Sequence, residues 1–549
     1  MSAGGVGAGW TYPDVWEAIA AAVPGRPAIV QGGRMVRWGE FDRRAGALAR
    51  AFLDAGLERG DAVALLMRNR PEYLESCFAA FKLGLAPVNV NHRYGAAEVA
   101  YLLRDSGAKA IVHEDDLRDV VDRALSGLPP LRLALRVGGD RSAAAEPGRY
   151  ERAVGHGGGP PAAAGRTGDD LLLLYTGGTT GMPKGVMWRQ DDLIQALELG
   201  ADPELELPPL RDAGDAARRA LAAEADRART RRLVLLAPPL MHATAMLTAF
   251  SSLTRGETVA LLPSAGFDAE ELWDEAERLE ATTITIVGQA FAAPMLDALD
   301  RHPGRWRLGA LRMIGSSGTV WSRENKDGLL RHLPAVALVD TMGSSEALAL
   351  SRSVSTKGAV TETGGFAIGP DVAVFREDGG RVLPGSGEAG LLGRSGHIPL
   401  GYHGDPVKTA RTFRFIEGRR WSLPGDLARV EEDGRIMLLG RGSNVINSGG
   451  EKIFPEEVEE SLKRHPAVAD AGVVGVPDDR FGQRVCAVVR PVGAPPDPDD
   501  LVRHVRTELA PFKAPRRIVL AAVPRLANGK LDYPALKRLV ATDAEGGSG

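Results

Sequence analysis

At 549 residues the chain is too long for one ordinary hydrophobic core, and its length predicts about three or four packed units. Apolar residues make up 44% and charged residues 25% of the chain, which predicts a soluble globular protein. The formal net charge is only −4, and no Lys/Arg-rich run is interleaved with aromatic residues, so a nucleic-acid-binding protein is not expected.

The two cysteines, Cys77 and Cys486, lie far apart without His or Cys companions, so they predict neither a disulfide framework nor a zinc site. The segment from Met1 to Asp14 lacks a basic start followed by an apolar stretch and is not expected to be a signal peptide. No run of about 18 apolar residues occurs, so no membrane span is expected. These features predict a cytoplasmic protein, with a monomer and a homodimer both open.

The first third of the chain alternates between patterns typical of helices and strands. Two helices and two strands are expected there, at Phe41–Leu57, Ala62–Leu66, Ala97–Ser106 and Ala110–Val112. The stretch Gly138–Asp169 is rich in Gly, Ala, Pro and Arg without periodicity, which predicts an exposed connection. An Ala/Arg-rich segment at 203–232 predicts a surface helix with a solvated face.

Short apolar runs recur through the middle of the chain, and helical patterns separate several of them, which predicts βαβ units and a largely parallel sheet. The expected strands are Leu171–Tyr175, Leu233–Ala237, Thr258–Leu262, Thr282–Val287, Leu311–Ile314 and Val336–Val339. The helices between them include Asp268–Glu280, Gln289–Asp300 and Ser322–Leu333. Ligands of such sheets bind beyond the carboxyl ends of the strands. Four of these strands run into polar loops, which predicts hydroxyls, glycines, one His and one carboxylate on a common rim.

The pattern changes after about Gly440, where a small α+β unit is expected. Its predicted elements are Pro455–His465 and Leu501–Leu509 as helices, and Ala471–Val476, Val485–Val489 and Ile518–Ala522 as strands. The joining residues ArgGlySerAsn have no strong local preference and fit a hinge. The tail from Thr542 is expected to fray.

The segment Thr176-Gly-Gly-Thr-Thr-Gly-Met-Pro-Lys184-Gly follows a predicted buried strand and has the composition of a phosphate loop. Its glycines let the backbone approach an anion, its hydroxyls donate hydrogen bonds, and Lys184 adds positive charge. It differs from a Walker A loop, because Pro183 precedes the lysine and Gly185 follows it.

This loop resembles the signature of the adenylate-forming superfamily, which comprises acyl- and aryl-CoA synthetases, firefly luciferases and peptide-synthetase adenylation domains. The resemblance runs from about Trp10 to Arg538, and further motifs follow in the same order. It implies a multi-domain α/β and α+β fold. An N-terminal adenylation domain, residues 1–440, would contain two β-sheet-and-helix subdomains and a small β-barrel. A small mobile α+β domain, residues 441–549, would follow and carry a catalytic lysine.

The resemblance also implies how ATP would be held. The pyrophosphate would contact Thr176, Gly177, Gly178, Thr179, Thr180 and Lys184. In the motif from Thr341 to Glu346, Thr341, Met342, Gly343, Ser344 and Ser345 would contact the nucleotide. Glu346, with Thr179, would hold Mg²⁺ on the ATP phosphates, since oxygen ligands suit a hard cation. The family usually has Tyr or Phe where Met342 stands, and a methionine can cover an adenine face through its polarizable sulfur.

Four further segments resemble family motifs. Gly315-Ser-Ser-Gly318-Thr319 resembles the adenine-binding segment, so Gly318 and Thr319 are expected at the nucleotide. Asp426, after TrpSerLeuProGly, would accept hydrogen bonds from both ribose hydroxyls, and Arg441 would contact ribose or phosphate. His242 resembles a histidine that lies near the acyl carboxylate and gates the acyl tunnel.

The C-terminal motifs imply a second reaction step. Ser443 stands at the hinge position, where the family more often has Asp or Lys. The loop Ser448-Gly449-Gly450-Glu451 would approach the pantetheine of CoA when the C-terminal domain has rotated. Lys530, presented by an AsnGly turn, would neutralise charge between the carboxylate and the α-phosphate during adenylation.

The acyl pocket is expected to be a roomy hydrophobic tunnel, because the residues placed there by resemblance are small or apolar, with no Lys or Arg among them. They are His242, Ala243, Thr244, Met246, Gly288, Gln289, Phe291 and Gly315. The string GlyMetProLysGlyValMetTrpArg and the SerSerGlu in place of a Thr-Glu pair look like actinobacterial fatty-acid and sterol-side-chain CoA ligases. Long-chain or polycyclic isoprenoid acids are therefore the expected substrates.

The resemblance thus implies an ATP-dependent acid–thiol ligase that forms an acyl-AMP with Mg²⁺ and transfers the acyl group to CoA. An enzyme that only adenylates, and passes the acyl-AMP to a partner or carrier, stays open because of Met342 and Ser443. A luciferase-like monooxygenase would need a specific substrate. A non-catalytic nucleotide- or CoA-binding regulator is disfavoured by the joint presence of Lys184, Glu346, Asp426 and Lys530.

Overall fold

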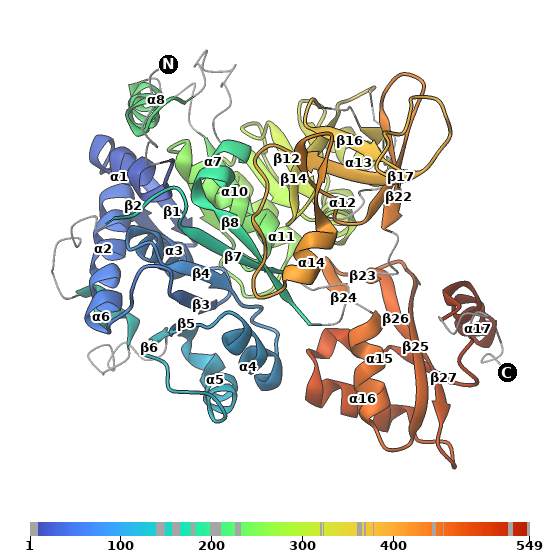
Figure 1. Ribbon diagram of the computed structural model, residues 1–549. Helices are drawn as coiled ribbons and strands as arrows, with labels where there is room; N and C mark the ends of the chain where they lie inside the picture. Colours follow the sequence, from blue (N-terminus) through green and yellow to red (C-terminus); the bar gives the residue numbers. More distant parts are fainter. Residues whose placement is uncertain are drawn as a thin grey trace.

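The computed structural model shown in Figure 1 places four β-sheets and the helices that cover them. It describes residues 9–138, 149–155, 165–176, 182–197, 210–225, 232–318, 321, 323–359, 365–366, 369–376, 378–441, 446–453, 455–524 and 531–545. None of the helices within these ranges has the length and apolar character needed to cross a bilayer.

The first sheet is mostly parallel. Its strands, in spatial order, are β18 (Gly401–Tyr402), β8 (Lys184–Arg189), β7 (Leu171–Thr176), β4 (Ala86–Asn89), β3 (Ala62–Leu66), β5 (Ala110–Glu114) and β6 (Leu133–Val137). The strands from β7 to β6 run parallel, and β8 and β18 are antiparallel additions at one edge. Every residue of β3 is buried, as expected for a central parallel strand that is covered on both faces.

The second sheet has eight strands and confirms the predicted βαβ pattern. Its strands, in spatial order, are β14 (Ala347–Ser355), β13 (Ala337–Ser344), β12 (Met313–Ser317), β11 (Thr283–Ile286), β9 (Leu233–Leu236), β10 (Thr258–Leu261), β1 (Pro27–Gln31) and β2 (Arg34–Arg37). The six strands from β13 to β1 are parallel, and only β14 and β2 pair antiparallel at the two edges.

Helices connect and cover these two sheets. They are α1 (Tyr12–Ala22), α2 (Trp38–Asp54), α3 (Pro71–Lys82), α4 (Ala96–Asp105), α5 (Arg118–Leu125), α6 (Tyr150–Gly155), α7 (Gln190–Leu197), α8 (Ala213–Ala225), α10 (Ala243–Thr254), α11 (Ala269–Arg278), α12 (Gln289–Arg301) and α13 (Arg323–His332). One large core cluster takes residues from both sheets and from α1, α2, α3 and α10. At its centre Trp16 stacks edge-on against Phe78 and Phe250, so these aromatic rings bind the two sheets into one body.

The third sheet is antiparallel. Its path is β15 (Gly365–Phe366), β22 (Ile436–Arg441), β21 (Asp426–Val430), β17 (Gly390–Ser395), β20 (Arg419–Ser422) and β19 (Phe413–Ile416), with β16 (Val372–Phe375) also paired to β17. The helix α14 (Pro406–Thr412) leads into β19. This sheet occupies the region in which a small β-barrel was expected.

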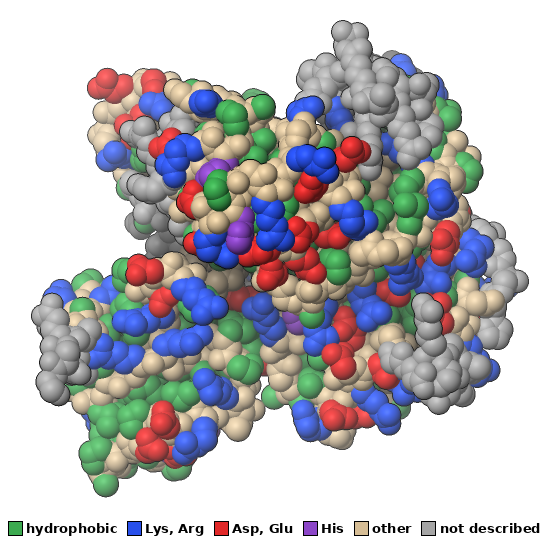
Figure 2. Space-filling model, turned by 180° about the vertical axis from the view of Figure 1, so that it is seen from behind, with side chains coloured by type: hydrophobic (Ala, Val, Ile, Leu, Met, Phe, Trp, Pro, Cys, Tyr) green, Lys and Arg blue, Asp and Glu red, His purple; other side chains and the backbone are tan. Residues whose placement is uncertain are grey.

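The C-terminal part contains the fourth sheet. Its strands are β24 (Glu451–Ile453), β23 (Ile446–Ser448), β26 (Gly482–Pro491), β25 (Val468–Asp478) and β27 (Arg517–Leu520), and its helices are α15 (Pro455–Arg464), α16 (Pro498–Glu508) and α17 (Tyr533–Glu545). In Figure 2, seen from behind, this part forms a lobe at the lower left that a cleft separates from the main body. The large N-terminal and small C-terminal parts agree with the predicted fold class. The boundary between residues 440 and 441 stays a prediction.

Two expectations about local structure were wrong. The segment Gly138–Asp169 contains a short helix, α6, whose Tyr150 and Val154 are buried, so it is more than an exposed connection. The strands β12 and β13 continue through the polar residues that were expected to follow them, because main-chain pairing with their neighbours does not depend on apolar side chains. The expected surface helix is confirmed as α8, which keeps an exposed face and packs its other face, with Ala216 and Ala220, against α1.

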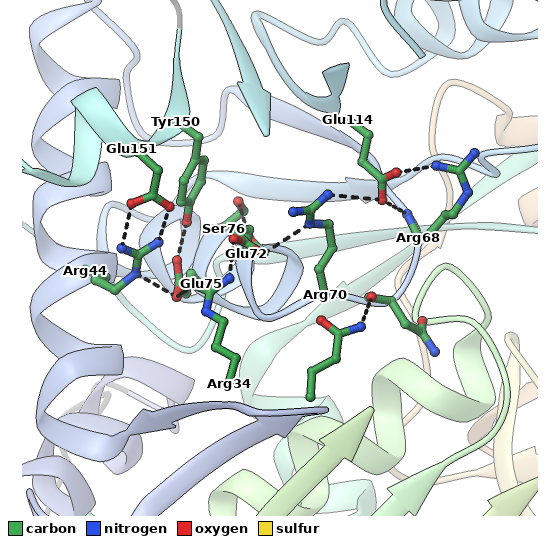
Figure 3. Close-up of polar contacts among 12 residues, drawn as sticks. Arg34, Arg44, Arg68, Arg70, Glu72, Glu75, Ser76, Glu114, Tyr150 and Glu151 are labelled. Atoms are coloured by element: carbon green, nitrogen blue, oxygen red, sulfur yellow. Dashed lines mark hydrogen bonds and ion pairs between the residues drawn. The ribbon is translucent and has the colours of Figure 1, made fainter. Parts of the chain in front are cut away.

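A buried polar network fixes α2, α3 and α6 to one another (Figure 3). Arg44 donates to Glu75 at 2.8 Å and to Glu151 at 2.9 Å, and the Tyr150 hydroxyl donates to Glu75 at 2.7 Å. Glu75 is fully buried, and burial raises its pKa despite the neighbouring Arg44. Since an ion pair out of water is stable only when its hydrogen bonds are complete, this network makes the packing of the three helices specific.

Candidate functional site

A cavity of about 970 Å³ lies where the two mixed sheets and the C-terminal lobe meet. Thr176, from the first sheet, lines it together with His242, Gly318 and Ser345 from the second sheet and its loops, and Gly450 from the C-terminal part. The expected common rim therefore comes from two sheets, because β7 belongs to the first sheet and β9, β12 and β13 to the second. Packing of the two sheets brings the polar segments into one site.

The hairpin of β7 and β8 positions the predicted phosphate loop. Thr176 and Lys184 are cross-strand partners at its loop end, and residues 177–181, which include Gly177, Gly178, Thr179 and Thr180, lie outside the described residues. The Lys184 ammonium is 3.7 Å from Asp405 Oδ2, in the segment that begins α14. The side chain of Lys184 is partly accessible, so its charge can meet an anion beside Thr176.

Glu346 lies in the tight turn between β13 and β14. The hydroxyl of Tyr402 donates to Glu346 Oε1 at 2.7 Å, and the indole of Trp188 donates to the carbonyl oxygen of Ser345 at 2.8 Å. Tyr402 and Trp188 both belong to the first sheet, so their hydrogen bonds fix the β13–β14 turn of the second sheet against the first sheet. The carboxylate is thereby oriented before any ligand binds.

The donor set at this turn fits a magnesium ion that arrives with a nucleotide. Within the described ranges, no three His, Cys, Asp or Glu side chains gather as they would in a metal site supplied wholly by the protein. Mg²⁺ is commonly held by one or two carboxylates together with phosphate oxygens and water. Glu346 can supply such a carboxylate.

Successive residues of β13 contact two different parts of the molecule. Thr341 and Gly343 line the cavity, whereas Met342 packs against the core cluster of the third sheet. The hydroxyl of Ser344, which also lines the cavity, is buried and makes no hydrogen bond to the described residues. A buried hydroxyl without a partner is costly, so this atom is suited to a ligand oxygen.

Asp426 and Arg441, both predicted at the ribose, are cross-strand partners of β21 and β22. Their proximity agrees with a shared ligand, although of Arg441 only the backbone is described. Gly318 lines the cavity with φ +94°, a conformation that favours glycine, and Thr319 lies outside the described residues.

His242 meets the C-terminal lobe directly. Its Nε2 lies 3.3 Å from Glu451 Oε1, and Arg93 donates to the same oxygen at 3.2 Å. Burial alone would raise the pKa of Glu451, but His242 and Arg93 lower it, and the net shift is downward. The carboxylate therefore stays charged at neutral pH and holds the lobe against the mouth of the cavity.

The loop from Ser448 to Glu451 lies at that mouth. Gly449 and Gly450 have φ of +59° and +84°, which only glycine adopts without strain. A β-carbon on Gly450 would lie 3.7 Å from Val287 and 3.8 Å from Phe291, both in the main body. These are ordinary van der Waals separations, so at Gly450 the positive φ angle, and not a lack of space, favours glycine. Ser443 and Lys530 lie outside the described residues.

Three residues that the sequence did not single out organise this entrance. The Asn89 side chain, at the end of β4, donates to the carbonyl oxygens of Tyr175 and Met241, at 2.9 and 2.7 Å. Arg93 binds Glu451, and the neighbouring His92 has a pKa lowered to about 4 by burial and by the charge of Arg93. In the sequence, the polar run Asn91-His92-Arg93 shortly after a buried parallel strand could have identified His92 and Arg93 as site residues.

The deeper part of the cavity departs from an apolar tunnel. Ala243, Thr244 and Gly315 line it as expected, whereas Met246 is buried in the main core. Gly288 donates its N–H to Ser316, Phe291 stacks edge-on with Phe267, and the side chain of Gln289 is not described. Contrary to the expectation that no arginine is present, the lining includes Arg232, Arg255, Arg312 and Arg352.

The sequence is similar to known families and proteins. A family described as AMP-binding enzyme matches residues 16–403, and its C-terminal domain family matches residues 457–530. The chain is 39% identical to the medium/long-chain-fatty-acid–CoA/3-oxocholest-4-en-26-oate–CoA ligase of Mycolicibacterium smegmatis, over 95% of this chain and 94% of that protein. It is 38% identical to the 3-oxocholest-4-en-26-oate–CoA ligase of Rhodococcus rhodochrous, with 95% and 94% covered.

The fold is also found in solved structures. The amide bond synthetase McbA from Marinactinospora thermotolerans superposes with a TM-score of 0.77 at 24% identity, covering 96% of this chain and 99% of that one. At this identity the likeness concerns the fold alone.

Proposed function

The chain belongs to the AMP-binding enzyme family, and on that premise we propose that it is an ATP-dependent acyl-CoA ligase for a hydrophobic carboxylic acid. The observation that carries the proposal is the convergence of Thr176, His242, Gly318, Ser345 and Gly450 on one cavity. These residues come from the two mixed sheets with their loops and from the C-terminal part.

In the first half-reaction a carboxylate oxygen of the acid attacks the α-phosphorus of ATP, the α–β phosphoanhydride bond breaks, and pyrophosphate leaves. The protein needs no covalent nucleophile for this step, and its contribution is to position the reactants and neutralise charge. Lys184 and the loop after Thr176 would neutralise the pyrophosphate, and Glu346 would hold Mg²⁺ on the phosphates. Bound Mg²⁺ supplies positive charge to the phosphate oxygens.

The nucleotide itself would lie between the second and third sheets. Ser344 offers an unsatisfied hydroxyl there, and the pairing of β21 with β22 places Asp426, the proposed ribose acceptor, opposite the backbone of Arg441. By the resemblance, Lys530 would offset the charge of the attacking carboxylate during adenylation.

In the second half-reaction the CoA sulfur attacks the acyl carbon, the mixed anhydride breaks, AMP leaves and the thiol proton is released. The presence of Gly450 and Glu451 in the cavity lining supports this step, because the C-terminal lobe then borders the cavity in which a pantetheine arm would meet the acyl group. It also favours a CoA ligase over an enzyme that only adenylates, since the latter has no use for a glycine-lined entrance formed with the lobe.

The names of relatives support a large hydrophobic acid as substrate. Two of the relatives are named for 3-oxocholest-4-en-26-oate, and one of these also for medium- and long-chain fatty acids.

The test is to incubate the protein with ATP, Mg²⁺ and a panel of fatty, aryl and polycyclic acids, with and without CoA, and to follow acyl-AMP and acyl-CoA separately by mass spectrometry. We expect acyl-CoA from long-chain or polycyclic acids. Acyl-AMP that persists in the presence of CoA would instead mean an adenylating enzyme that serves a partner or carrier.

The variant Lys530→Ala separates catalysis from binding. Loss of one charge-stabilising group should slow acyl-AMP formation by about 10²–10³-fold. Transfer from supplied acyl-AMP to CoA should change far less. Near-normal pyrophosphate release by this variant would contradict the role given to the lysine.

A further inference from the structure

Asn89 is the last residue of β4, a strand of the first sheet that lies beside β7 (Figure 1). Its side chain is buried and carries two N–H groups and one carbonyl oxygen. The oxygen accepts from the main-chain N–H of Tyr175 at 2.7 Å, and the amide nitrogen donates to the carbonyl oxygen of the same residue at 2.9 Å. The side chain thereby extends the pairing of β4 with β7, whose main chains pair at Val88 and Leu173.

The same amide nitrogen also reaches the second sheet. It donates to the carbonyl oxygen of Met241 at 2.7 Å, in the loop between β9 and α10. Met241 is the residue before His242, and Tyr175 is the residue before Thr176. One buried side chain therefore joins the positions directly before two residues of the cavity lining, of which one is on β7 and the other in the loop after β9.

A second asparagine, Asn69, fixes the earlier part of the same loop. Its amide nitrogen donates to the carbonyl oxygen of Pro238 at 3.0 Å, and its side-chain oxygen accepts from the N–H of Leu240 at 2.6 Å. With Pro238 and Leu240 held in this way, the hydrogen bond from Asn89 acts on the end of the loop, next to His242.

Few side chains can replace the amide of Asn89. Tyr175 offers both its N–H and its carbonyl oxygen and Met241 offers its carbonyl oxygen, so the residue between them has to donate twice and accept once. A carboxylate cannot donate, and a hydroxyl donates only once. An aliphatic side chain would leave these buried main-chain groups without partners, which is costly.

In the proposed adenylation step, Thr176 begins the loop at the ATP phosphates and His242 lies near the carboxylate of the acid. The carboxylate oxygen has to be held in line with the α-phosphorus. We propose that Asn89 is a positioning residue that sets the separation of these two reactants, by fixing the residues before Thr176 and His242 relative to each other. The proposal rests on the proposed function. It assigns Asn89 to the first half-reaction alone, because in acyl-AMP the two groups are already joined.

The test measures the two half-reactions separately in Asn89→Leu and in the milder Asn89→Ser. Acyl-AMP formation is measured against the concentrations of ATP and of acid, with hexadecanoate and a 3-oxo-steroid-26-oate as the acids, and transfer is measured with CoA and supplied acyl-AMP. We expect Asn89→Leu to slow acyl-AMP formation at saturating substrates about 10²-fold, the effect of a misplacement of about 1 Å. The half-saturating concentrations and the transfer rate should change little. Asn89→Ser should lie between Asn89→Leu and wild type, since its hydroxyl can still donate once.

Gln190→Met is the matched control. Gln190 is also a buried amide that accepts from a main-chain N–H, that of Tyr12 at 2.9 Å, and it lies outside the cavity lining. We expect this variant to lower the melting temperature without changing the ratio of the two half-reaction rates. Melting curves show whether each variant is folded, and Asn89→Ser decides the question if Asn89→Leu does not fold.

An equal loss in both half-reactions, a loss that appears only as higher half-saturating concentrations, or unchanged rates in the folded variants would overturn the positioning role and leave the proposed function intact. The same imbalance in Gln190→Met would also overturn it, because loss of any buried amide would then have this effect. Wild-type protein that forms no acyl-AMP from either acid would overturn the proposed function and this inference with it.

Discussion

Gly315 shows how one residue leaves room in the cavity. It lies on β12, its backbone conformation is open to any residue, and an added β-carbon would meet no atom within 4 Å. Neither a turn nor a close backbone contact therefore requires glycine at this position. The space beside it belongs to the cavity, so its lack of a side chain enlarges the cavity.

We expect Gly315→Leu to lower kcat/KM for hexadecanoate and for polycyclic acids about 10-fold or more, because in the proposed function its side chain would occupy the space of the acyl group. A short acid such as butanoate should react as before. Gly309→Leu is the matched control, since Gly309 is exposed and also has open space around it. Equal losses for short and long acids in Gly315→Leu would show that the change harms folding and not the fit of the substrate.

The two cysteines are buried hydrophobic residues and not reactive groups. Cys77 on α3 and Cys486 on β26 are both fully buried, and burial raises the pKa of each thiol. Since the thiolate is the reactive form, we expect neither to react with a disulfide reagent within minutes in the native protein, and both to react in denaturant. A native thiol that titrates at once would contradict this assignment.

At the scale of elements, the buried network of Figure 3 determines how α2, α3 and α6 pack. We expect Arg44→Met to lower the free energy of unfolding by about 3–5 kcal/mol, because it leaves the carboxylate of Glu75 buried without its main partner. Denaturant unfolding of purified protein measures this change.

The matched control is Glu151→Gln, which removes the other partner of Arg44. Its side chain is 51% exposed, so the cost should stay within about 1 kcal/mol. If both variants cost the same, the stability of this region would come from surface charge and not from the buried pair.

At the scale of the whole molecule, a buried ion triad joins the C-terminal lobe to the main body. Lys513 lies 3.0 Å from Glu98 on α4 and 2.8 Å from Glu457 on α15, and all three side chains are at most 5% exposed. Burial lowers the pKa of Lys513, but these negative groups outweigh it and raise the pKa above its ordinary value. Together with the contact of Glu451 to His242, the triad stabilises the orientation in which the glycine loop lies at the cavity mouth.

We expect Lys513→Met to slow transfer of the acyl group from acyl-AMP to CoA at least about 10-fold, because Glu98 and Glu457 would then repel each other across the interface. Pyrophosphate exchange, which uses another lobe orientation in the proposed mechanism, should change little. Lys537→Met, on the exposed face of α17, is the control. Equal losses in both half-reactions would argue that the triad maintains folding and not the orientation of the lobe.

The sequence by itself determined the order of strands and helices and the parallel character of the second sheet, since these follow from local periodicity and from apolar runs. It also determined the contiguous motifs, such as the turn that presents Glu346, because all their residues lie within a few positions of one another. Their roles at ATP and CoA remain predictions of the resemblance.

Only the tertiary structure decided which segments face one another. Thr176 and Gly318 stand at the ends of strands of different sheets, Arg93 meets Glu451 across the lobe interface, and Arg255 at the end of α10 lines the same cavity as Arg352 on β14. Such contacts depend on the rotational phase of α10 and on the register of β13 with β14, and neither is encoded in a short stretch of sequence. For this reason the sequence predicted an apolar tunnel, and the packed structure placed arginines in its lining.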